Sequence, residues 1–211
     1  MSLHLGDVVP NFTAETTIGE IDFFAYLGDD WGILLSHPGD YTPVCTTEIG
    51  RTSQLTEEFR KRNVKPLVIS VDPVKDHHGW IKDINEILNT RVDFPLIADP
   101  ERKVSLLYDM IHPNASATAT VRSVFIIGPD KKLKLTLTYP PAIGRNFDEI
   151  IRVIDALQLS AKHSISTPAD WKMGDDVIVA NTMATDEAEM KFNTQVKVVR
   201  PYLRFIAQPD K

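Results

Sequence analysis

Short apolar runs rich in β-branched residues alternate along this chain with segments of helical periodicity. Strands are predicted at residues 33–36, 66–71 and 96–98, and helices over residues 45–61 and 74–88 lie between them. This alternation is typical of an α/β sheet. The run at 66–71 is almost continuously hydrophobic, which favours a strand covered on both faces. The pattern therefore limits the chain to a layered fold with a largely buried central sheet.

The second part of the chain adds an antiparallel hairpin and a closing helix. A brief helix at 104–108 precedes two arms at 121–127 and 132–139, joined by a turn at 128–131. An amphipathic helix then opens at Arg145 or Asn146. The order of strands and helices is thioredoxin-like, so we expect an α/β, thioredoxin-like fold with a central mixed sheet flanked by helices.

The character of the sequence changes near Thr167. Residues 166–211 hold several prolines, strand-like runs at 177–179 and 196–199, and no long helix. We therefore predict a thioredoxin-like domain over residues 1–165 and a C-terminal extension over residues 166–211. A segment this short is expected to be unable to bury a core of its own. We expect it to pack against a partner subunit at a dimer interface.

Charge and hydropathy exclude several classes of function. The formal net charge is −6, which argues against a nucleic-acid partner. No apolar run approaches the roughly 18 residues that span a membrane. The first residues lack the basic start and apolar run of a secretion signal, and a single cysteine cannot form an intrachain disulfide. We expect a cytoplasmic protein.

The single cysteine, Cys45, follows the strand at 33–36 and opens the next helix. Amide N–H groups at such a strand-to-helix turn favour the thiolate, which is a nucleophile. A cysteine deep in a core is instead an inert small hydrophobe. The functional question is which of the two Cys45 is.

Residues next to Cys45 supply candidates for peroxide chemistry. Thr42 lies one turn before it, so its hydroxyl can face the sulfur and donate to a peroxide oxygen. Pro38 shapes the loop and can shield a thiolate from water. Glu48, one turn after Cys45, can orient an arginine. His37 has two interpretations, a contact to substrate or a histidine that is merely packed or backbone-bonded.

A reactive thiolate also needs a permanent cation beside it. Arg122 is the main candidate, because an arginine that begins an apolar strand is costly to bury unless it is paired. The alternative is a strand-end arginine whose head reaches solvent. Arg145 is either a second, supporting cation or a surface residue at a helix start.

The run Pro38-x3-Thr42-x2-Cys45 resembles the active-site motif of the peroxiredoxins. Similarity to the single-cysteine (1-Cys) branch, the peroxiredoxin-six subfamily, extends over nearly the whole chain. Its other motifs are Gly128-Pro129-Asp130-Lys131-Lys132-Leu133-Lys134-Leu135, Gly144-Arg145-Asn146-Phe147-Asp148-Glu149-Ile150 and Thr167-Pro168-Ala169-Asp170-Trp171.

The resemblance implies a role for each residue at the matching positions. Cys45 is the peroxidatic cysteine, Thr42 and Arg122 complete the activation triad, and Pro38 shields it. His37 and Glu48 also match subfamily positions. The subfamily fold carries a C-terminal extension that contributes to a homodimer. We therefore expect a homodimer, and assembly into a higher oligomer is left open.

The expected activity is reduction of hydrogen peroxide and organic hydroperoxides through a Cys45 sulfenic acid, with no cofactor. Because the chain has no second cysteine, reduction must come from an external donor: glutathione, a thioredoxin-like protein or ascorbate. The same lack predicts sensitivity to sulfinic acid formation at high peroxide.

Some subfamily members also hydrolyse phospholipids through a serine in a Gly-Asp-Ser-Trp-Gly segment with a histidine and an aspartate. Here Asp30 replaces the serine, Phe24 aligns with the histidine, and only Asp130 remains. A carboxylate cannot replace a serine nucleophile without its base, so phospholipase activity is not expected.

Three rival interpretations stand beside the peroxidase. A cysteine hydrolase would need a histidine base near Cys45, and His37 is the only one nearby in sequence. A peroxide sensor or a holdase chaperone on the same fold would not turn over with a reductant. We expect no metal, because the adjacent His77 and His78 cannot both face one ion from a helix and are interpreted as a surface pair.

Overall fold

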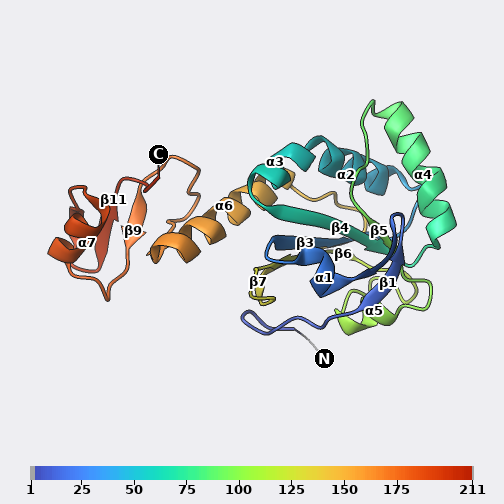
Figure 1. Cartoon of the computed structure of the whole chain (residues 1–211), viewed down its shortest axis with the longest axis horizontal. Coiled ribbons are helices and arrows are strands. Elements are labelled where there is room, and N and C mark those ends of the chain that lie inside the picture. Colours follow the sequence, from blue (N-terminus) through green and yellow to red (C-terminus); the bar gives the residue numbers. More distant parts are fainter. Residues whose placement is uncertain (1–2, 211) are drawn as a thin grey trace. The chain divides into compact units, whose positions relative to one another are not determined.

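The structure is a computed structural model that describes residues 3–210. The chain forms two compact units that divide between Phe147 and Asp148. The predicted domain boundary at 165/166 differs from this division, because the helix that begins at Phe147 shares buried contacts with the tail that follows it. Figure 1 traces the chain from the N-terminal unit to the C-terminal one.

The N-terminal unit is built on a seven-stranded sheet. The order across the sheet is β2-β1-β5-β4-β3-β6-β7. Only the β3–β4 and β4–β5 pairs are parallel, so the sheet is mixed. The strands are β1 (Thr13–Thr16), β2 (Gly19–Asp22), β3 (Trp31–Ser36), β4 (Val64–Ser70), β5 (Leu96–Ala98), β6 (Arg122–Ile127) and β7 (Leu133–Tyr139).

Helices cover both faces of this sheet (Figure 1). One face carries α2 (Pro43–Gln54), α3 (Thr56–Lys61) and α4 (Val74–Ile87). The other carries α1 (Phe23–Leu27) and α5 (Lys103–Leu107). A mixed sheet flanked by helices confirms the predicted α/β, thioredoxin-like fold.

One core cluster lies between the sheet and the α1/α5 layer. Alternate residues of the central strands point to it, as the two-residue period of a strand requires. They pack with side chains from both helices and from the N-terminal segment, and the cluster of buried residues is Val9, Phe23, Leu27, Leu34, Leu67, Ile69, Ile97, Val104, Tyr108, Met110, Phe125, Ile127 and Leu133.

Strand pairing brings the ends of β3 and β6 together. The strands are antiparallel, with Leu35 opposite Val124, so β3 ends where β6 begins. The buried Ser36 hydroxyl donates to the carbonyl of Val121 (2.6 Å) and accepts from the amide of Ser123 (2.9 Å). The segment that leads from β3 to Cys45 is therefore fixed beside the residue that opens β6.

The C-terminal unit has a small core, which residues of the tail share with residues of the preceding helix. Its sheet has the order β10-β11-β9-β8. The buried side chains are Leu159, Ile165, Trp171, Val177, Val179, Ala188, Val196 and Ile206. The elements are α6 (Phe147–His163), β8 (Ile165–Ser166), β9 (Val177–Val179), α7 (Thr185–Phe192), β10 (Lys197–Arg200) and β11 (Leu203–Ile206). The tail alone does not complete this core, because the end of α6 contributes Leu159 to the cluster, and its packing against a partner subunit stays a prediction.

The single helix predicted over residues 45–61 is two helices in the structure. Leu55 separates α2 from α3 and serves as the C-cap of one and the N-cap of the other. The β1–β2 hairpin, α1, α7, β8 and β11 were not predicted, because each is short and lacks a long apolar period. The central strands and α4 lie within a few residues of their predicted places.

Candidate active site

Cys45 lies in the first turn of α2, where backbone amides have no partner inside the helix. Thr42 is the N-cap and Pro43 the first helical residue, which suits a proline because its missing N–H would be unpaired there anyway. The Cys45 side chain is 0% exposed. The positive end of the helix dipole therefore acts on a sulfur that is shielded from water.

Arg122 places a guanidinium beside this sulfur. Its Nη1 lies 3.3 Å from Cys45 Sγ and 2.7 Å from Glu48 Oε2. Its Nε and Nη2 donate to the carbonyl of Pro141 at 2.9 and 2.7 Å. The Arg122 side chain is only 3% exposed, so the alternative of a head group that reaches solvent is wrong.

Glu48 joins the two arginines predicted for the site. Its carboxylate accepts from Arg122 and from Nε and Nη2 of Arg145, at 2.9 and 2.7 Å, and also from the Arg145 amide at 2.8 Å. Burial raises the pKa of Glu48, but the Arg145 guanidinium and then Arg122 outweigh it and hold the pKa below its usual value. Arg145 is buried and also donates to Ser123 O, so it is no surface residue.

The permanent charges around Cys45 do not balance among themselves. Two buried guanidiniums face one carboxylate, which leaves one positive charge next to Cys45 Sγ. In a poorly hydrated site an unpaired charge is expensive. The arrangement therefore places a permanent cation and hydrogen-bond donors beside the Cys45 sulfur.

Thr42 and Pro38 lie in the loop between β3 and α2. The Thr42 hydroxyl donates to the carbonyl of Gly39 at 2.8 Å. Its proton is thus engaged, and toward a peroxide it offers a lone pair, which corrects the expectation that it donates. Pro38 is partly buried in the same loop.

His37 is fully buried, and its partner is Asp40, which sequence reasoning missed. Its Nε2 lies 3.0 Å from Asp40 Oδ1, and Asp40 Oδ2 lies 2.6 Å from His77 Nδ1. His77 is also buried, whereas His78 is exposed, so the interpretation of the two as a surface pair is wrong. His77, Trp80 and Ile84 form the buried face of α4, and this helical spacing was the signal in the sequence.

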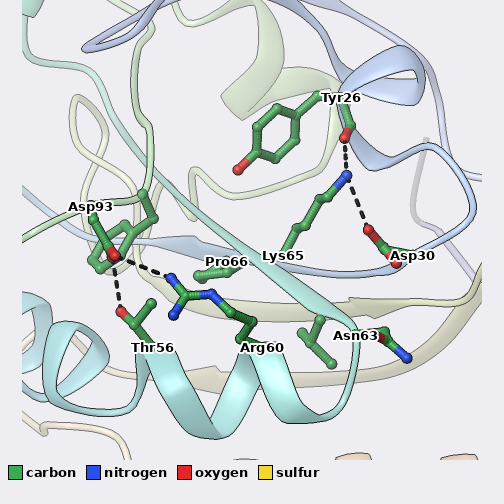
Figure 2. Close-up of a pocket in the computed structure, with 10 residues that line it drawn as sticks. Tyr26, Asp30, Thr56, Arg60, Asn63, Lys65, Pro66 and Asp93 are labelled. Atoms are coloured by element: carbon green, nitrogen blue, oxygen red, sulfur yellow. Dashed lines mark hydrogen bonds and ion pairs between the residues drawn. The ribbon is translucent and has the colours of Figure 1, made fainter.

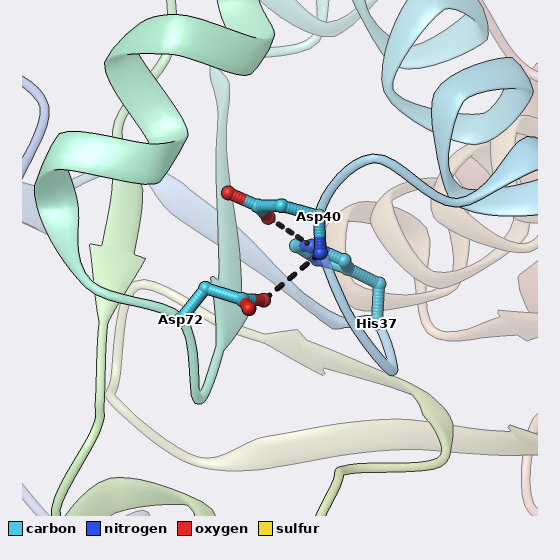
Figure 3. Close-up of side chains that lie close together, drawn as sticks. All are labelled: His37, Asp40 and Asp72. Carbon is cyan, nitrogen blue, oxygen red and sulfur yellow. Dashed lines mark hydrogen bonds and ion pairs between the residues drawn. The ribbon is translucent and has the colours of Figure 1, made fainter.

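His37, Asp40 and Asp72 lie close enough to be considered as metal ligands (Figure 3). One donor atom from each lies within 4.8 Å of the others. Those donors are already engaged: Asp72 Oδ2 accepts from the Asp40 amide at 2.9 Å and from Ser70 Oγ at 2.7 Å. The cluster is thus a hydrogen-bonded support for the loop, and the absence of a metal stays a prediction.

Asp30, at the position of the phospholipase serine, lines a pocket of about 260 Å³ (Figure 2). It is paired there with Lys65, whose Nζ lies 3.0 Å from its carboxylate. Phe24 is partly buried, and Asp130 is paired with Lys134 at 2.7 Å. These carboxylates are committed to ion pairs, and the expected lack of phospholipase activity stays a prediction.

A hydrolase-like pair is not seen at the cysteine. Within residues 3–210, the only side-chain hydrogen bond to Cys45 Sγ comes from Arg122. A buried thiol at a helix N-terminus, held by a permanent cation on a mixed sheet, defines a thiol oxidoreductase of thioredoxin-like fold. The chain has no second cysteine to resolve an oxidised one.

Comparison with known proteins narrows this class. Residues 5–136 match the AhpC/TSA family, and residues 156–195 match the C-terminal domain of 1-Cys peroxiredoxin. A 1-Cys peroxiredoxin of Dictyostelium discoideum is 50% identical over 209 residues, which cover 99% of this chain and 87% of the relative. The chain therefore belongs to the AhpC/TSA family, in its 1-Cys peroxiredoxin branch, and is a thiol-dependent peroxidase.

Solved structures agree over nearly the whole chain. The C45S mutant of the peroxiredoxin 6 of Arenicola marina has a TM-score of 0.92 and 46% identity, covering 99% of this chain and 100% of that one. The yeast mitochondrial 1-Cys peroxiredoxin has a TM-score of 0.91 and 48% identity, covering 97% and 99%. In the described part of the chain, no helix is both long and apolar enough to cross a membrane.

Proposed function

We propose that Cys45 is the peroxidatic cysteine and that the protein reduces hydrogen peroxide and organic hydroperoxides. The Cys45 thiolate attacks one peroxide oxygen and the O–O bond breaks. The other oxygen takes a proton from solvent, which replaces the one released when the thiol ionised, and leaves as water or alcohol. Cys45 becomes a sulfenic acid. The observation that carries this proposal is the Arg122 guanidinium 3.3 Å from Cys45 Sγ in a buried site.

The surrounding residues have distinct roles in this proposal. Arg122 stabilises the thiolate and the charge that develops on the departing oxygen. Glu48 and Arg145 hold that guanidinium in place, and the Thr42 hydroxyl oxygen accepts a hydrogen bond from the peroxide. Pro38 keeps bulk water from the sulfur.

Organic substrates can be accommodated beside Thr42. A pocket of about 340 Å³ is lined by Tyr41, Thr42, Pro43, Thr46, Trp80, Asp83 and Ile87. Its aromatic and aliphatic walls suit an alkyl group. The negative charge of Asp83 disfavours an anionic substrate.

The reductant is proposed to be an external thiol. The yeast mitochondrial 1-Cys peroxiredoxin has a thiol resolving mechanism via glutathione/thioredoxin systems. This chain likewise has a single cysteine, so we propose glutathione or a thioredoxin-like protein as donor, with ascorbate as the non-thiol alternative. A cytoplasmic location stays a prediction that cell fractionation tests, since the yeast relative is mitochondrial.

The test is to mix reduced protein with a small excess of hydrogen peroxide and to follow Cys45 by stopped flow and intact mass. We expect fast addition of one oxygen atom, followed by turnover when glutathione or thioredoxin is added. Cys45→Ser is the blank. Oxidation no faster than that of a free thiol would overturn the proposal. Fast oxidation without turnover by any of the three donors would favour a peroxide sensor.

Thr42→Val is expected to slow Cys45 oxidation by about 100-fold, since it removes one polar contact to the peroxide in the transition state. Thr47→Val is a matched control, because Thr47 is exposed and bonds only the carbonyl of Val44 in its own helix. Stopped-flow rate constants for both variants check the prediction, and equal rates would remove Thr42 from the site.

Excess peroxide is expected to inactivate the protein during turnover. No second cysteine captures the sulfenic acid, so a second peroxide competes with the reductant for it. Intact mass should then show two added oxygen atoms, and activity should not return with thiol. Full recovery of activity after a large peroxide excess would contradict this.

We also propose a homodimer to which the C-terminal extension, residues 166–211, contributes. Large apolar side chains are exposed on its β10–β11 hairpin: Val198, Val199 and Tyr202, at 55%, 42% and 69%. Such a group on a single chain is typical of an interaction surface. Light scattering should give twice the mass of the chain. The double variant Val198→Lys, Tyr202→Lys should reduce the measured mass to that of a single chain.

A further inference from the structure

Three buried hydrogen bonds in series link the loop that precedes Cys45 to the sheet. His37 Nε2 lies 3.0 Å from Asp40 Oδ1, Asp40 Oδ2 lies 2.6 Å from His77 Nδ1, and His77 Nε2 lies 3.2 Å from the carbonyl oxygen of Ile97. Both histidine side chains are 0% exposed and that of Asp40 is 2% exposed. The series connects three elements: the loop before α2, helix α4 and strand β5.

The partners fix where the protons are. A backbone carbonyl only accepts, so His77 Nε2 must carry a proton. Burial raises the pKa of Asp40, but hydrogen bonds from His37 and His77 outweigh it and hold the pKa below its usual value. Asp40 is therefore a carboxylate and also accepts, so His77 Nδ1 must carry a proton as well.

His37 differs from His77 in its partners. Its Nε2 donates to the same carboxylate, and its Nδ1 is buried and has no partner among the described residues. Burial lowers the pKa of His37, with Asp40 and Asp72 acting in the opposite direction and His77 in the same one. His37 is thus neutral, with its proton on Nε2 and a free lone pair on Nδ1.

We propose that His77 is a positioning residue of the peroxidase site, a buried imidazolium ion that pairs with Asp40. This pair holds the loop from Pro38 to Thr42 in place. It also fixes the tautomer of His37. This inference rests on the proposed function of Cys45. Asp40 stands in the middle of that loop, so its anchor determines where the loop presents Pro38 and Thr42. The positive ring also opposes a metal ion at His37, Asp40 and Asp72.

Two further hydrogen bonds hold the backbone of the same loop. The Asp40 amide donates to Asp72 at 2.9 Å, while the carbonyl of His37 accepts from Thr120 Oγ1 at 2.6 Å. The backbone of the loop is thus held by neutral or anionic groups. In the His77–Asp40 contact, by contrast, the group that holds the loop is a cation.

The first experiment reads the proton state directly. Protein with ¹⁵N-labelled histidine is examined by NMR at neutral pH, with His77→Asn and His78→Asn used for assignment. We expect two protonated ring nitrogens on His77 and one on His37. In Asp40→Asn, His77 should lose one of its protons, because its anionic partner is gone. A bare nitrogen on His77 in the wild type would overturn the inference.

The second experiment reads the positioning role. His77→Asn keeps a donor toward Asp40 but removes the charge, and we expect it to slow Cys45 oxidation by about 10- to 100-fold, since small displacements of reacting groups are costly. His78→Asn, the same change on the exposed neighbour, should match the wild type. An unchanged rate in His77→Asn would overturn the positioning role.

The two proposals fail in different ways. If wild-type Cys45 reacts no faster than a free thiol, the proposed function fails and the positioning role with it. If the wild type is fast and His77 carries only one ring proton, the inference alone fails. The NMR result does not require a folded His77 variant, because His77 can also be assigned by elimination, with the other five histidines of the chain replaced by Asn one at a time.

Discussion

Arg122→Met is expected to lower the rate constant of Cys45 oxidation by about 1,000-fold, in line with the loss of a preorganised charged donor. The substitution keeps the length of the side chain but removes the cation 3.3 Å from Cys45 Sγ. It also leaves Glu48 with Arg145 as its only cationic partner, so no net positive charge remains to stabilise a thiolate. Stopped-flow measurement with hydrogen peroxide gives the rate constant.

Two further variants make this result specific. Arg60→Met is the matched control, since Arg60 is 59% exposed and pairs with Glu57 on the surface. It should react like the wild type. Arg122→Lys keeps the charge but loses the planar guanidinium that also binds Pro141 O. Its rate constant should therefore lie between those of Arg122→Met and the wild type. A fast Arg122→Met variant would place the source of activation elsewhere.

Glu48→Gln is expected to destabilise the fold by about 3–5 kcal/mol, the range for breaking a buried ion pair. The Glu48 side chain is 2% exposed and accepts from both arginines, so the amide leaves two buried guanidiniums without an anion. Urea unfolding at neutral pH, followed by tryptophan fluorescence, measures the difference. Glu57→Gln, on the surface, should change stability by no more than about 0.5 kcal/mol.

The effect of Glu48 depends on pH in a defined direction. Its pKa in the folded protein lies below the ordinary 4.5. The carboxylate therefore contributes its full stabilisation above pH 4.5, and this is lost as the pH falls through the lower folded value. The stability gap between the wild type and Glu48→Gln should shrink in acid. A gap that stayed constant would mean that the charge of Glu48 is not what stabilises the site.

The sequence was sufficient to predict the central strands of the sheet and the residues that surround Cys45. Long apolar runs such as 66–71 predict buried strands because few other structures bury them, and Arg122 stood out because a cation at the start of an apolar strand needs a partner. The structure brings Cys45, Glu48, Arg122 and Arg145 together, as that reasoning anticipated. Their roles in turnover stay predictions.

What could not be predicted depends on contacts between distant segments. The break at Leu55 interrupts a sequence that is helical on both sides, and β1 has only four residues. The partnership of Asp40 and His77 joins positions that are 37 residues apart, so no local pattern signals it. The small core of the C-terminal unit depends on a helix assigned to the preceding domain.

The pairing of β3 with β6 has a consequence for protein engineering. Cys45 follows one of these strands and Arg122 opens the other, so their separation is set mainly by backbone hydrogen bonds of the sheet. The turn at residues 128–131 lies at the opposite end of β6. Insertions or fused peptides placed in that turn should leave the reactive pair intact, which makes it a suitable place to attach a reporter or a tether.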